Sequence, residues 1–185
     1  MRPGQALPPY GDLVNRLLPW SRRAPSGRPL SRADYAGALY GSLLAASVVA
    51  AASAVGDFPR LQLVVLLLVT GLVFWAAHVY AHLAGERLVG RRLDWTETRR
   101  VGRREWPIVE AAVLPAVAVA LSPLLGLGLS GTAWLALGVA VTQQVAWACI
   151  GALHAGASRA LVSVEGAVNL ILGLAIVAAK VAVGH

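Results

Sequence analysis

The chain has 185 residues, of which 57% are hydrophobic and 14% charged, and its net charge is +7. Its mean hydropathy is +0.66, which excludes an ordinary soluble domain and predicts a membrane protein. Because Cys149 is the only cysteine, an intramolecular disulfide is also excluded.

Residues 1–32 precede the first apolar run and are predicted to form a separate N-terminal segment. Five apolar side chains recur there at helical spacing: Tyr10, Leu13, Val14, Leu17 and Leu18. Such spacing predicts a short amphipathic helix that lies in the membrane interface. Pro25 and Pro29 separate it from the first apolar run.

Residues 33–185 contain five apolar runs, at 33–55, 61–83, 108–125, 132–153 and 160–183. A helix of about 20 apolar residues spans a bilayer, and each run is too long and uniform for a barrel strand. We therefore predict an all-α polytopic membrane bundle of five transmembrane helices, with short interfacial helices. In the first run, the small residues Gly37, Gly41 and Ala45 predict a close helix contact, within the bundle or between protomers.

The segment between the second and third runs is predicted to hold another interfacial helix. Asp94 and Glu97 have the spacing of a capping box, and Trp95 and Trp106 are suited to the headgroup level.

Basic residues are distributed unevenly around the five runs. Six arginines precede the first run, seven lie between the second and third, and Arg159 lies between the fourth and fifth, whereas only Arg60 and Lys180 lie near the other side. The positive-inside rule therefore predicts a cytoplasmic N-terminus and an external C-terminus. Abundant Arg, Ala, Gly and Val beside a single Lys are typical of GC-rich bacteria, which suggests a bacterial inner (plasma) membrane. The positive charge suits anionic lipids, and no nucleic-acid partner is expected.

Four ionisable residues fall toward the predicted cytoplasmic ends of the runs: His78, His82, Glu110 and Glu165. An ionisable group in hydrocarbon is unfavourable by about 3 kcal/mol or more, so it usually has a partner or a function. His78 and His82 are four residues apart, which lets two imidazoles converge on one metal ion if other helices supply the remaining ligands. We predict that the four share one ion or proton site, with a divalent metal as a candidate ligand and no certain cofactor.

Two further residues extend this predicted site. His154 ends the fourth run on the same side, and Asn169 follows Glu165 by one helical turn, where it is expected to hold Glu165 by hydrogen bonding. The alternative is that such polar residues only join helices, each contributing ~1 kcal/mol. For His154 alone, that structural interpretation is favoured.

Two resemblances accompany this pattern. Phe74 to His82 reads Phe-Trp-x-x-His-x-Tyr-x-His, and on it the chain resembles uncharacterised small actinobacterial integral membrane proteins, which implies no known activity. The topology, with Ala81 to Glu86 and the proline-containing third run, is similar to the vacuolar iron transporter family, whose dimers exchange ferrous or manganous ions for protons. Because the first run lacks an interior acid and Met1 is the only methionine, we carry over the topology alone.

The sequence thus predicts a transporter or channel for a cation or protons. The alternative is a non-transporting accessory or structural subunit of a membrane complex, and a homo-oligomer is a candidate assembly. No nucleophile elbow, zinc-protease motif, phosphate loop or dinucleotide motif occurs, so an enzyme is not expected. Bound metal is expected to be lost as pH falls through the range in which histidine becomes charged.

Overall fold

The computed structural model describes residues 32–54, 56, 58–88 and 94–183, where all regular elements are helical. They are α2 (Arg32–Ala54), α3 (Arg60–Leu88), α4 (Trp95–Arg104), α5 (Pro107–Leu121), the 3₁₀ helix η2 (Ser122–Leu125), α6 (Leu129–His154) and α7 (Arg159–Val183). Five stretches of the described residues are long and apolar enough to cross a membrane, which confirms the predicted all-α membrane bundle. The predicted N-terminal interfacial helix lies outside the described residues.

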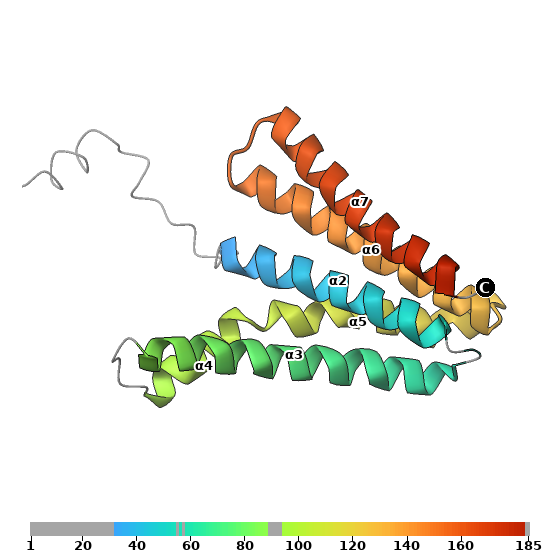
Figure 1. Ribbon diagram of the computed structural model, residues 1–185, viewed down its shortest axis with the longest axis horizontal. Coiled ribbons are helices and arrows are strands. Elements are labelled where there is room, and N and C mark those ends of the chain that lie inside the picture. Colours follow the sequence, from blue (N-terminus) through green and yellow to red (C-terminus); the bar gives the residue numbers. More distant parts are fainter. Residues whose placement is uncertain (1–31, 55, 57, 89–93, 184–185) are drawn as a thin grey trace, which may run out of the picture. The chain divides into compact units, whose positions relative to one another are not determined.

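Helix α2 lies in the middle of this bundle, between the pair α3–α5 and the pair α6–α7 (Figure 1). Half of the apolar part of α2 is buried, against 17% for α3 and α7. The beginning of α2, helix α4 and the α6–α7 turn lie at one end of the bundle, which we call the α4 end. The α2–α3 and α5–α6 connections lie at the opposite end, which we call the Arg60 end.

Small side chains allow α2 to pack closely against its neighbours. A Cβ atom added to Gly41 would lie 2.7 Å from both the Ala111 Cβ and the Ile108 carbonyl oxygen of α5, whereas one added to Gly37 would make only ordinary contacts. The predicted contact of the Gly37–Ala45 row is therefore made within the bundle. The surrounding core is also rich in alanine, with Ala45, Ala46, Ala116, Ala136 and Ala140 all buried.

At the Arg60 end, one arginine connects three elements. Arg60, in the first turn of α3, donates from Nε to Ser122 Oγ (3.1 Å) and to Thr132 Oγ1 (3.3 Å), and from Nη2 to the Leu127 carbonyl oxygen. Thr132 also donates to Ser122 at 2.8 Å. These bonds fix the α5–α6 connection against the beginning of α3.

Helix α4 begins where the sequence predicted it to begin. Asp94 is the N-cap, and its side chain accepts a bond from the Trp95 N–H at 2.7 Å, while Glu97 pairs with Arg100 at 2.5 Å. Trp75 of α3 donates from Nε1 to the Gly102 carbonyl oxygen at 2.8 Å. Helix α4 is therefore fastened to the membrane-spanning part of α3.

Adding one methyl group to Gly41 tests the close contact between α2 and α5. Gly41→Ala is expected to lower the free energy of unfolding by about 1–3 kcal/mol, because backbone and side-chain atoms of α5 must shift. The matched variant Gly37→Ala, which meets ordinary contact distances, should leave stability unchanged or raise it slightly. Thermal unfolding in one detergent measures both, and equal effects of the two substitutions would contradict this packing.

Candidate functional site

Among the predicted site residues, His82 lies beside Glu105, which was not predicted to be part of the site. His82 Nδ1 lies 3.7 Å from Glu105 Oε1, and the His82 side chain is 47% exposed while that of Glu105 is 9% exposed. Glu105 closes α4, and its backbone N–H donates to the Val101 carbonyl oxygen. The sequence signal for Glu105 was its place immediately before Trp106 and Pro107, where one helix stops and the next begins.

The depth of this pair follows from helix geometry. His82 lies 22 residues after Arg60, or about 33 Å along α3. Because the hydrocarbon core of a bilayer is about 30 Å thick, an α3 that enters hydrocarbon near Arg60 leaves it near His82. With that placement, the His82–Glu105 pair would lie at the membrane boundary rather than in the membrane interior.

His78 contacts a different element from His82. Its Nδ1 lies 3.0 Å from the Phe74 carbonyl oxygen in its own helix, and its ring lies 4.9 Å from the ring of Tyr40 in α2. The two histidines share α3 and a helical spacing, but their observed contacts are with Tyr40 and Glu105 respectively.

A second group of predicted residues gathers between α2, α6 and α7. The His154 ring stacks on Tyr35 at 5.7 Å, and Trp147 meets the same ring edge-on at 6.0 Å. Tyr35, Trp147 and Glu165 line one groove of about 260 Å³ at the α4 end. Glu165 is exposed, and its carboxylate makes no hydrogen bond or ion pair with any described residue.

Asn169 is buried, and it fixes the backbone beneath Glu165. Its Nδ2 donates to the Glu165 backbone carbonyl oxygen at 2.9 Å, so the predicted hydrogen bond reaches the main chain and not the carboxylate. Gln144 of α6 donates from Nε2 to the Asn169 carbonyl oxygen (3.0 Å) and to its Oδ1 (3.2 Å). Asn169 therefore serves to connect α6 with α7.

The predicted residues thus lie in separate places at the α4 end. Glu110 is exposed on the first turn of α5. Within the described residues, no three His, Cys, Asp or Glu side chains are grouped so that they could hold a metal ion. The Glu165 groove brings three functional side chains together, because one carboxylate and two aromatic rings line the same surface.

Gln143, in the middle of α6, replaces a hydrogen bond that proline removes from α5. Pro115 lies inside α5 and has no N–H, so the Ala111 carbonyl oxygen lacks its helical donor. Gln143 Nε2 donates to this oxygen at 3.0 Å and to Ser42 Oγ of α2 at 3.0 Å. The sequence signal for this role was the proline inside the third apolar run, which leaves one backbone carbonyl oxygen without its helical donor.

Comparison with known protein families, curated proteins and solved structures finds no match for this chain. The function is therefore argued from the arrangement of its own residues.

The replacement of the proline-deleted bond can be tested by a double-mutant cycle. Gln143→Leu should lower stability by about 1–3 kcal/mol, because it leaves the Ala111 carbonyl oxygen without a donor. Pro115→Ala restores the backbone N–H, so Gln143→Leu should be clearly less harmful in that background. The free energy of unfolding of each variant is measured by reversible unfolding in micelles that mix a mild detergent with a denaturing one. An equal loss in both backgrounds would show that Gln143 and Pro115 are not coupled.

Proposed function

We propose that this protein moves protons or another cation across a bacterial plasma membrane, and that Glu165 binds the ion. The observation that carries this proposal is the exposed Glu165 carboxylate in a groove with Tyr35 and Trp147. An aromatic face attracts cations, and a carboxylate supplies the opposite charge. The groove therefore has the chemistry of a cation-binding surface.

The depth of Glu165 supports a functional role. It lies six residues after Arg159, or about 9 Å along α7, on the apolar stretch between Arg159 and Lys180. A carboxylate at this depth is expensive to keep charged unless water or a cation accompanies it, so it typically marks an ion or proton pathway. Its own helix supplies no compensating partner among the described residues.

The grouping of ligands favours protons or a monovalent cation. A tightly bound transition metal takes about four ligands from Cys, His, Asp or Glu side chains, and the described residues bring no three of these together. A single carboxylate is sufficient for proton binding. His154 stacks on Tyr35, which lines the same groove as Glu165.

The alternative function, a non-transporting subunit of a membrane complex, is favoured by a different observation. Apart from Glu105 at the membrane boundary, the buried polar side chains among the described residues are uncharged. They are Ser42, Ser122, Thr132, Gln143, Gln144 and Asn169. Buried amides and hydroxyls that bond to neighbouring helices are typical of structural contacts in membranes.

Removing the charge of Glu165 separates the two functions. Wild-type protein in liposomes should carry protons or a monovalent cation with a pH-dependent rate between about pH 5 and 8, and Glu165→Gln should abolish this flux while leaving the protein folded. Flux is measured with an internal pH dye and with cation-selective dyes.

Glu97→Gln is the matched control, because it removes a carboxylate that pairs with Arg100 in α4, outside the groove. Its flux should equal that of the wild type. A wild type without flux at any pH in this range would support the accessory function instead.

The proposed orientation places the α4 end in the cytoplasm. Reporter fusions test it: a C-terminal fusion should be active with a periplasmic reporter and inactive with a cytoplasmic one, because most basic residues lie on the opposite side. The same reporters inserted between Gly156 and Ser158, in the α6–α7 turn, should show the reverse activities. A cytoplasmic reporter that is active at the C-terminus would contradict this orientation.

A further inference from the structure

Helix α4 packs one face against α3 and presents arginines on the other. Val101 and Glu105 are buried on the inner face, and Trp75 of α3 donates to the Gly102 carbonyl oxygen at 2.8 Å. The outer face of α4 is exposed and consists of Thr96, Arg99, Arg100, Arg103 and Arg104. Because the inner face is fastened to α3, the outer face is held in one orientation.

Three of these four arginines lack a counter-charge. Arg100 pairs with Glu97 at 2.5 Å. Arg99, Arg103 and Arg104 make no hydrogen bond or ion pair with any residue that the structure describes, and the acid next in sequence, Glu105, is buried beside His82. A guanidinium group binds a phosphate through two parallel hydrogen bonds. Three unpaired guanidinium groups on one short helix therefore form a surface suited to phosphate groups.

Two exposed tryptophans and the depth of α4 point to lipid headgroups as the source of the phosphate. Trp95, which begins α4, is 77% exposed, and Trp106, which follows its end, is 43% exposed; tryptophan is enriched where membrane meets water. The bond from Trp75 reaches α4 seven residues before His82, or about 10 Å along α3 on the membrane side of the boundary placed near His82. Amphipathic helices of the interface lie about 5–10 Å deep, so α4 has the depth of such a helix.

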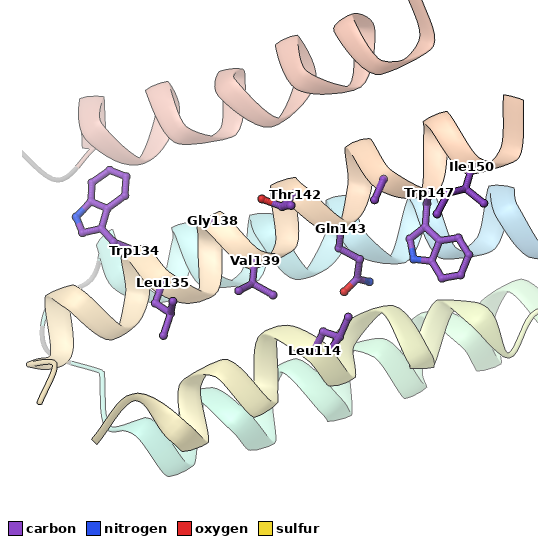
Figure 2. A pocket seen from close by; sticks show the side chains of 10 residues that line it. Leu114, Trp134, Leu135, Gly138, Val139, Thr142, Gln143, Trp147 and Ile150 are labelled. Carbon is purple, nitrogen blue, oxygen red and sulfur yellow. The ribbon is translucent and has the colours of Figure 1, made fainter. Parts of the chain in front are cut away.

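The surface of α6 is different in character. Its groove of about 670 Å³ extends from Trp134 to Ile150, a distance of about 24 Å along the helix (Figure 2). None of the described residues that line this groove is charged, and the Gln143 amide group donates inward to α2 and α5. This groove suits apolar acyl chains, whereas the outer face of α4 suits the charged ends of the same lipids.

We propose that the outer face of α4 binds the headgroups of anionic phospholipids, with Arg99, Arg103 and Arg104 in contact with their phosphate groups. Three positive charges favour a headgroup with a net negative charge over a zwitterionic one. A nucleic acid also offers phosphates, but α4 is fastened at the depth where lipid phosphates lie, which favours lipid. This surface is separate from the Glu165 groove, so the proposal is independent of whether the protein transports an ion.

Quenching of a fluorophore on α4 measures which lipids gather there. In a Cys149→Ala background, Thr96→Cys places a labelled thiol on the outer face, one turn before Arg99 and Arg100. The full chain is reconstituted in phosphatidylcholine nanodiscs that contain increasing shares of phosphatidylglycerol or phosphatidylcholine carrying a nitroxide near the top of one acyl chain. The ratio of the two apparent affinities should exceed tenfold in favour of phosphatidylglycerol. Equal quenching by the two lipids would overturn the proposal.

Charge removal tests the arginines themselves. Arg99→Gln/Arg103→Gln should lower the affinity ratio roughly tenfold, because each basic residue near a membrane surface contributes about a fivefold preference for anionic lipid. Both side chains are exposed, so the variant should fold, and the midpoint of thermal unfolding checks this. Arg99→Lys/Arg103→Lys keeps the charges and should retain most of the ratio.

The matched control removes the same amount of charge from α7. Arg159→Gln/Lys180→Gln should leave the affinity ratio at the α4 fluorophore close to that of the wild type. An unchanged ratio in Arg99→Gln/Arg103→Gln, or an equal loss in the α7 control, would overturn the proposal. Nanodiscs expose both faces of the bilayer, so the same fluorophore also reports an added RNA oligonucleotide. RNA that binds this face in the presence of phosphatidylglycerol would assign it to nucleic acid instead.

Discussion

In hydrocarbon, buried polar groups need hydrogen-bond partners within protein. In this bundle the Nε2 groups of Gln143 and Gln144 donate to four acceptors on other helices, while Oε1 of each has no partner among the described residues. Gln143 joins α6 to Ser42 of α2 and to the Ala111 carbonyl oxygen that Pro115 leaves without a helical donor. Gln144 joins α6 to Asn169 of α7. Two adjacent amides therefore connect one helix to three others, and the remaining contacts can be made by small apolar side chains.

Of these two amides, Gln144 also helps to position the groove at the α4 end. Asn169, held by Gln144, bonds to the backbone of Glu165 one turn earlier, which fixes where that carboxylate leaves α7. On the other wall, a Cβ atom added to Gly151 would lie 3.2 Å from Tyr35, so α2 and α6 are in close contact where the aromatic rings stand. The geometry beside Glu165 thus depends on contacts deeper in the membrane.

Features that depend on local sequence were predictable, and features that depend on partners were not. The five apolar runs, and the start of α4 at Asp94, follow from length, hydropathy and capping chemistry within a few residues. The contacts of His78 and His82 depend on which element packs against each side chain: α2 in the case of His78, and the α4–α5 junction in the case of His82. The spacing of the two histidines does not predict these neighbours. Glu105 was missed because its burial arises only when α3 and α4 pack together, and the partner of Gln143 became visible only once Pro115 was placed opposite it.

The central place of α2 has a consequence for biosynthesis. As the first of the five to leave the ribosome, α2 would enter the bilayer before α5, α6 and α7, the helices that cover its buried half. Its own run is less apolar than α3, which follows it, and it carries Ser42 with no interhelical donor until Gln143, about a hundred residues later, arrives. Until the second half of the chain has been synthesised, the face of α2 that is buried in the finished bundle would therefore be covered by lipid, by α3 or by the insertion machinery.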